Sequence, residues 1–251
     1  MDFDRYSRQC ILSEIGAKGQ DRLACSRVVV VGLGALGGIT AEYLARAGVG
    51  YLRIIDRDIV EESNLSRQTL FTQKDADEGL PKALAAKRYL HLLNATIEIE
   101  SHNSDLNASN CDELLSDVDI ILDGTDNYPT RFLINDYAVK MGLPWIYTAV
   151  LGMEGVCMAI VPAKGPCLTC LMEREPEAGS FETTECVGVL GPTPGLVSCL
   201  QSARAIRYLV EGEMDLNLVS VNIWTGDFRS RSLARRKDCP TCGRGEFPYL
   251  G

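Results

Sequence analysis

The sequence has 251 residues, 46% of them hydrophobic and 24% charged, with a formal net charge of −9. This composition is typical of a globular protein with a buried core, and its acidity disfavours binding to nucleic acid or anionic membranes, which needs basic patches. No apolar run reaches the ~18 residues of a membrane-spanning helix, and the N-terminal residues lack the apolar centre of a signal peptide. We therefore expect a cytoplasmic protein that does not contact a membrane.

Predicted helices and strands alternate along the first part of the chain. Four consecutive valines at 28–31 predict a buried strand, and further helices and strands follow it in turn. This alternation is typical of an α/β fold of the Rossmann-like type, with a doubly wound, mostly parallel sheet. The expected elements are helical at 5–25, 36–47, 81–93, 109–115 and 127–141, and extended at 28–31, 51–56, 96–101, 118–122 and 145–148.

The later part of the chain has a different pattern. Residues 153–162 predict an antiparallel strand, residues 193–210 an apolar helix, and residues 217–233 a hairpin-like pair of strands. No linker or internal repeat separates these segments from the first part. We therefore predict one domain over residues 1–251, with an antiparallel C-terminal extension of the sheet.

A glycine-rich loop follows the valine strand directly. Gly32, Gly34 and Gly37 have the G-x-G-x-x-G spacing of a loop that joins a strand to a helix and holds phosphate on backbone N–H groups. Asp56 ends the second predicted strand, where such folds place an acid that binds ribose hydroxyls. These residues leave NAD, FAD and ATP open as ligands.

The polar segment after the second strand favours a triphosphate. It contains Asn64, Arg67 and Gln68 in SNLSRQ and Lys82 in GLPK, and arginine and lysine side chains bind phosphate groups. Asp126, in DGTDN, follows another buried strand and offers a carboxylate ligand for a metal ion. A pyrophosphate held by the glycine loop needs no such set, whereas a triphosphate does. The alternative is that these are solvated surface charges.

The cysteines are spaced unevenly. Cys167 and Cys170 form one C-x-x-C pair, and Cys239 and Cys242 form another. Together they predict one tetrahedral Cys₄ zinc site if the fold brings the pairs together. The alternative is a redox pair, but neither motif opens a helix after a βαβ strand. Cys186 stands alone in a polar loop.

Several short motifs occur in one order, namely RYSRQ, GLGALG, IIDRD, NLSRQ, G-x-x-K, DGTDN and the two C-x-x-C pairs. In this order they resemble the ubiquitin-activating-like superfamily, and most of all its short bacterial branch of MoeB/ThiF-like sulfur-carrier adenylyltransferases. The likeness runs from Arg5 to Cys242. It implies an enzyme that uses ATP to adenylate the C-terminal Gly-Gly carboxylate of a ubiquitin-like sulfur-carrier protein and releases pyrophosphate.

The resemblance also implies roles for single residues. Arg8, in RYSRQ, would enter the ATP site of a partner subunit, which implies a homodimer. Asp126 would help to place Mg²⁺, and the four paired cysteines would bind structural Zn²⁺. The resemblance implies catalytic roles for five residues, namely Arg8, Arg67, Lys82, Asp126 and Cys186. The expected nucleotide-binding residues are Gly32, Gly34, Gly37, Asp56, Asp58, Asn64, Arg67, Gln68, Lys82, Asp126 and Asn127.

The proposed reaction suits a chain with few histidines. A carboxylate is ionised near neutral pH, so the site must align it on the α-phosphate and neutralise charge on the leaving pyrophosphate, without a general base. We expect residues 1–150 to bind the nucleotide and residues 151–251 to bind the carrier and zinc. No rhodanese-like extension follows residue 242, so a separate protein is expected to donate the sulfur.

Other functions remain open at this point. The same adenylation could act on a small-molecule carboxylate or a modified tRNA base. If the protein were a nicotinamide-dependent oxidoreductase, Arg67, Lys82 and Asp126 would be surface charges without a common role. A catalytically inactive binding module could use the same surface. Cys186 is either a covalent or sulfur-transferring residue or an incidental exposed thiol. The carrier could serve the synthesis of molybdopterin, thiamine, thiolated tRNA or cysteine.

Overall fold

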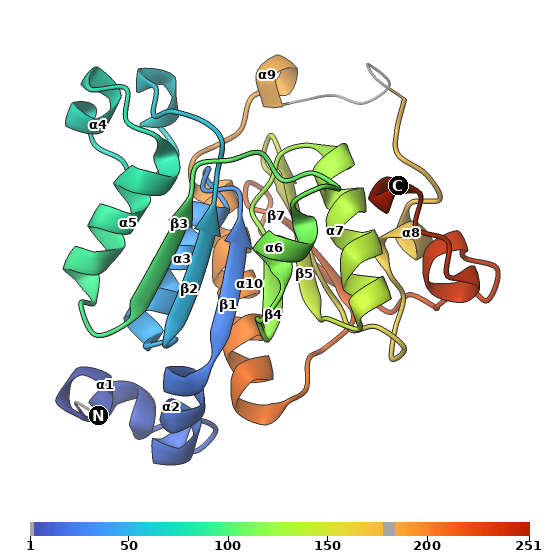
Figure 1. The fold of residues 1–251 in the computed structure, drawn as a ribbon, viewed down its shortest axis with the longest axis horizontal. Coiled ribbons are helices and arrows are strands. Elements are labelled where there is room, and N and C mark those ends of the chain that lie inside the picture. Colours follow the sequence, from blue (N-terminus) through green and yellow to red (C-terminus); the bar gives the residue numbers. More distant parts are fainter. Residues whose placement is uncertain (1–2, 178–183) are drawn as a thin grey trace.

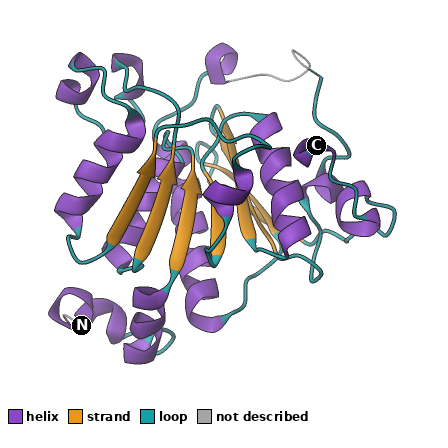
Figure 2. Ribbon diagram, viewed as in Figure 1, coloured by secondary structure: helices purple, strands orange, loops and turns teal. Residues whose placement is uncertain are grey.

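A single eight-stranded sheet forms the centre of the protein in the computed structural model, which describes residues 3–177 and 184–251. The strand order is β3-β2-β1-β4-β5-β6-β7-β8, and helices lie on both faces of the sheet (Figures 1 and 2). The strands are β1 (Arg27–Val31), β2 (Tyr51–Ile55), β3 (Glu98–His102), β4 (Ile120–Asp123), β5 (Trp145–Leu151), β6 (Glu154–Ile160), β7 (Leu218–Asn222) and β8 (Asp227–Arg231).

The sheet divides into a parallel and an antiparallel part. Strands β1 to β5 pair in parallel, with Val28 in register with Leu52 on one side and Ile120 on the other. Strands β6, β7 and β8 are antiparallel to their neighbours. The predicted Rossmann-like sheet with an antiparallel C-terminal extension is therefore confirmed.

Two apolar clusters lie on opposite faces of the sheet. Successive strand side chains point to opposite faces, so Val28 and Val30 belong to the cluster under the helices at 37–47, 82–93 and 192–211. Val29 and Val31 belong to the cluster under the helices at 111–115 and 128–141. Burial on both faces explains the unbroken run of valines. The helices are α1 (Phe3–Cys10), α2 (Gly16–Cys25), α3 (Gly37–Ala47), α4 (Gln73–Asp77), α5 (Lys82–Leu93), α6 (Cys111–Leu115), α7 (Tyr128–Met141), α8 (Leu168–Leu171), α9 (Thr184–Val187) and α10 (Pro192–Glu211).

The polar segment after β2 contains two short helical elements that were not predicted from the sequence. It forms a 3₁₀ turn at Glu62–Asn64 and the short helix α4, which begins with a capping box between Thr72 and Asp75. The short helices α8 and α9 were also not predicted. Among the described residues, no helix combines the length and the apolar character needed to cross a membrane.

Candidate functional site

The glycine loop packs against the end of β4. Gly32 has a φ of +83°, and its N–H donates to Ile55 O at 2.8 Å. A Cβ atom on Gly37 would lie 1.8 Å from Gly32 O, and one on Gly32 would lie 2.6 Å from Gly124 O. Both positions therefore require glycine. At Gly34, by contrast, a Cβ would meet nothing closer than a Gln68 amide nitrogen at 3.8 Å, so this part of the loop is open.

Asp56 ties the glycine loop to the end of β2. Its carboxylate is buried and accepts hydrogen bonds from Leu33 N at 2.6 Å and from Asp58 N at 2.8 Å. Burial raises the pKa of Asp56, while these two N–H groups and the charge of Lys82 oppose the shift. Each carboxylate oxygen has a further lone pair, so the group can still accept a hydrogen bond from a ribose hydroxyl.

Lys82 brings a positive charge to the same place. It begins α5, and its N–H donates to Asp58 O at 2.8 Å, which holds the start of the helix against the loop after β2. Its Nζ atom forms an ion pair with Asp58 Oδ2 at 3.0 Å, and the lysine side chain is buried. A buried ammonium group with one exposed carboxylate partner is a suitable site for a phosphate group.

The segment SNLSRQ contributes two buried amides. Asn64 Oδ1 accepts a hydrogen bond from Glu61 N at 3.2 Å, which closes the 3₁₀ turn. Gln68 lies against Gly34, and its Oε1 atom is buried without a hydrogen-bond partner in the described part of the chain. Such an unpaired atom costs about 1–3 kcal/mol, so a hydrogen-bond donor from a ligand would stabilise it. Arg67 is half-buried, and its Nη1 donates to Ser63 O at 2.9 Å.

A buried ion pair supports the turn after β4. Asp123 is fully buried and accepts hydrogen bonds from both the N–H (2.9 Å) and the hydroxyl (2.6 Å) of Thr125. Arg131, one turn into α7, pairs with Asp123 at 3.3 Å and donates to Thr125 O at 2.5 Å. Neither residue was predicted from the sequence, although the acid that directly follows the VDIIL strand was a signal for Asp123. The pair fixes the backbone that leads to Asp126.

Asp126 and Asn127 follow this turn. Asp126 is exposed, and Asn127 caps α7, because its Oδ1 accepts from Thr130 N at 3.0 Å. The loops after β2, β1 and β4 adjoin one another, because these strands are parallel neighbours in the sheet. The structure thus gathers the predicted residues of the glycine loop, the polar segment and DGTDN at one edge of the sheet, the usual ligand position in this fold.

Two of the predicted catalytic residues lie apart from this group. Arg8 is exposed on α1, which lies near the amino ends of the strands, at the opposite end of the sheet from the glycine loop (Figure 1). Cys186 is exposed on α9, which lies above the carboxyl ends of the strands. Residue Gly188, just after α9, accepts a hydrogen bond from Gly152 N at 3.0 Å, which places α9 beside the β5–β6 turn. Residues 178–183, just before α9, lie outside the described residues.

The two C-x-x-C pairs meet although they are far apart in the sequence. The Sγ atoms of Cys167 and Cys239 are 3.6 Å apart, those of Cys170 and Cys242 are 3.4 Å apart, and all four lie within 4.8 Å of one another. Sulfur atoms around a tetrahedral zinc ion with Zn–S bonds of ~2.3 Å are about 3.8 Å apart. The four thiols therefore fit one zinc ion. The predicted convergence of the pairs is confirmed.

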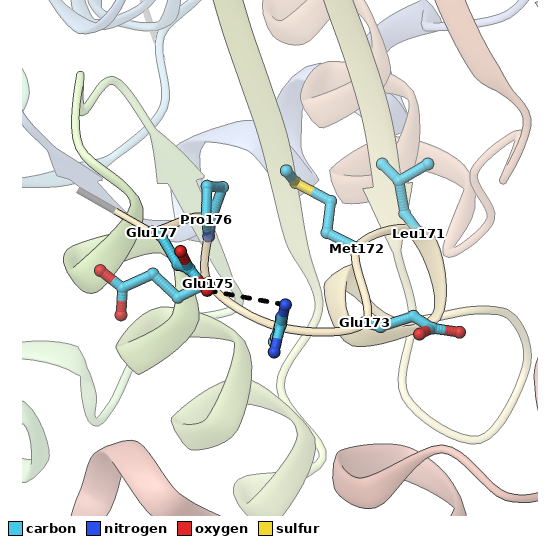
Figure 3. Close-up of a pocket in the computed structure, with 7 residues that line it drawn as sticks. Leu171, Met172, Glu173, Glu175, Pro176 and Glu177 are labelled. Atoms are coloured by element: carbon cyan, nitrogen blue, oxygen red, sulfur yellow. Dashed lines mark ion pairs between the residues drawn. The ribbon is translucent and has the colours of Figure 1, made fainter. Parts of the chain in front are cut away.

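A surface pocket of about 700 Å³ lies directly after α8 and beside the cysteine cluster. Figure 3 shows the acidic side chains of Glu173, Glu175 and Glu177 around it, together with the apolar side chains of Leu171, Met172 and Pro176. Its lining belongs to one continuous segment, residues 171–177, and includes none of the predicted nucleotide-binding residues. It is therefore separate from the site at the glycine loop.

Comparison with known proteins shows the family to which the chain belongs. Residues 6–241 match the ThiF family along nearly the whole chain. The chain belongs to the ThiF family. It is 41% identical to the sulfur carrier protein ThiS adenylyltransferase of Bacillus subtilis, over 98% of this chain and 73% of the relative. It is also 41% identical to the SAMP-activating enzyme E1 of Haloferax volcanii, over 96% of this chain and 89% of the relative.

A solved structure shares the fold of this ThiF-family chain. The structure of E. coli MccB with ATP superposes with a TM-score of 0.82 at 25% identity, covering 96% of this chain and 75% of that one. The predicted family and fold are therefore confirmed. The enzyme class predicted from the sequence, an adenylyltransferase, is confirmed by the family and by relatives named for that activity.

Proposed function

We propose that this ThiF-family protein uses ATP to adenylate the C-terminal Gly-Gly carboxylate of a ubiquitin-like sulfur-carrier protein. The observation that carries the proposal is the buried ammonium group of Lys82, held by Asp58 next to the glycine loop. A dinucleotide on the glycine loop needs no such cation, whereas a leaving pyrophosphate does. The names of the relatives, which include sulfur-carrier adenylyltransferases, support the same substrate class.

In the proposed reaction, a carboxylate oxygen of the carrier attacks the α-phosphorus of ATP. A new oxygen–phosphorus bond forms, the bond from the α-phosphorus to the bridging oxygen breaks, and the electron pair leaves with pyrophosphate. Backbone N–H groups of the glycine loop would hold the phosphates, and Asp56 would hold the ribose. Lys82, Arg67 and Asn64 would stabilise the charge that develops on the leaving group.

A magnesium ion fits the proposed site. Asp126 offers an exposed carboxylate on a turn that Asp123 and Arg131 hold in place. Carboxylate and phosphate oxygens are the ligands that Mg²⁺ prefers. Bound there, the ion would neutralise charge on the phosphate oxygens.

The remaining predicted features belong to the same proposal. Arg8 would enter the nucleotide site of a second subunit, so the active form would be a homodimer with two shared sites. Residues 1–150 would bind the nucleotide, and residues 151–251 would bind the carrier and a structural zinc ion at the four cysteines. Cys186 would act after adenylation, with sulfur from a separate donor, and the enzyme would work in the cytoplasm.

The proposal can be tested by following the α-phosphate. The purified protein is incubated with ATP labelled at the α-phosphate, Mg²⁺ and a Gly-Gly-ended carrier, and the carrier is examined by mass spectrometry at low temperature. We expect an AMP adduct on the carrier terminus. The matched control is the same carrier without its last two glycines, which should acquire no adduct. Adduct formation on a small carboxylate or a tRNA, with none on any carrier, would overturn the proposed substrate class.

A further inference from the structure

The two cysteine loops share more than their thiols. Each has a threonine before its second cysteine, as Thr169 in CLTC and Thr241 in CPTC. Both threonines are buried, and their hydroxyl groups lie 2.9 Å apart. The loops therefore contact each other through a hydroxyl–hydroxyl hydrogen bond as well as through the sulfur cluster.

Two consecutive residues of α7 bind these loops, one residue to each loop. Asn135 accepts a hydrogen bond from Leu168 N at 2.9 Å and donates to Thr169 Oγ1 at 3.2 Å. Asp136 accepts a hydrogen bond from Thr241 Oγ1 at 3.1 Å. The helix thus holds the first loop through an amide and the second through a carboxylate.

Asp136 also fixes the C-terminal end of the chain. Its Oδ2 atom accepts a hydrogen bond from Tyr249 N at 3.0 Å, and the Tyr249 ring stacks on Phe132 of α7 with centroids 5.2 Å apart. One carboxylate therefore contacts the second cysteine loop and the segment that follows it.

The burial of these two side chains indicates a specific role. Asn135 and Asp136 are both 0% exposed, and within residues 3–177 and 184–251 no cation forms an ion pair with Asp136. A buried carboxyl group without a cation is costly unless fixed donors satisfy it. Here the donors all belong to the second cysteine loop, the C-terminal segment or the neighbouring amide of Asn135.

We propose that Asn135 and Asp136 are positioning residues that hold the two cysteine loops in register, so that the four thiols converge before a metal ion binds. The inference rests on the proposal that zinc occupies the cysteine site. Bringing together two segments that are distant in the sequence costs conformational entropy. A hydrogen-bond network that already joins them removes this cost from metal binding, as preorganisation does for other ligands.

The test is zinc retention by the full chain. Zinc-loaded protein is mixed with a chromogenic chelator, and the rate of zinc transfer is compared among Asp136→Asn, Thr241→Val and the unsubstituted protein. Loss of partners around a metal site typically lowers metal affinity by about 10–100-fold. We expect zinc transfer to be faster by a factor in that range in both variants, and the tetrahedral Co²⁺–thiolate absorption of the cobalt-loaded proteins to weaken.

The control is a neighbouring position on the same helix. Tyr137→Phe removes a hydrogen bond to Asp112 at 3.1 Å, which lies away from the cysteine loops, so its zinc transfer should match that of the unsubstituted protein. Thr241→Ser keeps the hydroxyl and should restore slow transfer. If Asp136→Asn fails to fold, as judged by circular dichroism, Thr241→Val alone decides the test.

Two results would overturn the inference. If Thr241→Val releases zinc at the rate of Tyr137→Phe, the network does not position the cysteines, although the zinc site itself remains. If the unsubstituted protein binds no zinc, both the zinc site and the inference fail. Neither result bears on whether the protein adenylates a carrier, because that reaction is followed separately through AMP on the carrier.

Discussion

The Nζ atom of Lys82 lies 3.0 Å from Oδ2 of Asp58, and the two side chains are 7% and 55% exposed. The lysine is thus removed from water, while its partner reaches solvent. The Asp58 carboxylate and the start of α5 both hold the lysine side chain in place. Its ammonium group therefore needs little rearrangement to bind a phosphate group.

Replacement of Lys82 tests this arrangement. Lys82→Ala should lower kcat/KM for adenylation by about 10²–10³-fold, the usual effect of removing one preorganised donor at developing charge. Lys74→Ala is the matched control, because Lys74, on α4, is 82% exposed and pairs with Glu78 just after the helix. The measurement is steady-state pyrophosphate release. Equal rates for the two variants would show that Lys82 does not act on the phosphates.

Two glycines of the loop allow an effect on folding to be distinguished from an effect on ATP binding. Gly37→Ala should destabilise the protein, because its Cβ would lie 1.8 Å from Gly32 O, whereas Gly34→Ala should fold normally, with its Cβ pointing into open space beside Gln68. That added methyl group should occupy phosphate space and weaken ATP binding. Thermal unfolding with and without ATP measures both effects. A Gly34→Ala variant stabilised by ATP as much as the unsubstituted protein would place the phosphates elsewhere.

Asp56 predicts a pH dependence of stability. Because burial raises its pKa, the folded protein keeps a proton that the unfolded chain has already lost between the ordinary and the raised value. The stability contributed by this group therefore falls as the pH rises through that window. Asp56→Asn lacks the titration, so the unsubstituted protein should lose stability relative to the variant across the window. Chemical denaturation at a series of acidic pH values measures the free energy of unfolding of both proteins. If the difference between the two values does not change with pH, the prediction is contradicted.

The position of Arg8 predicts complementation between subunits. Arg8→Ala and Arg67→Ala should each be nearly inactive, because Arg8 would complete the site of the other subunit while Arg67 acts within its own. A mixture that exchanges subunits should regain roughly a quarter of full activity, because half of the dimers are mixed and each has one intact site. Mixed activity that stays at the level of the single variants would show that Arg8 does not act across a dimer.

Much of the fold could be predicted from local patterns. The valine strand and glycine spacing predicted β1 and the start of α3, because buried parallel strands and phosphate loops constrain neighbouring residues directly. The 3₁₀ turn and α4 were not predicted, although Thr72 and Asp75 have the spacing of a capping box. Because that segment is rich in charged residues, it was interpreted as a loop, and the capping box was not recognised as the start of a helix.

The supporting contacts of the two sites depend on tertiary packing. Asp123 meets Arg131 only because α7 folds back along β4, and Asn135 meets Thr169 only because the first cysteine loop packs on the same helix. No spacing in the sequence indicates either contact. The cysteine cluster itself was predictable, because zinc sites reuse the C-x-x-C spacing whatever the fold that joins the pairs.

The most direct test of the central claim is ATP–pyrophosphate exchange by the purified protein, with and without a Gly-Gly-ended carrier protein. Reversible adenylation of the carrier predicts exchange that requires the carrier, requires both terminal glycines and is lost in Lys82→Ala. Exchange that proceeds equally well without any carrier, or its absence with every such carrier despite ATP binding, would contradict the account.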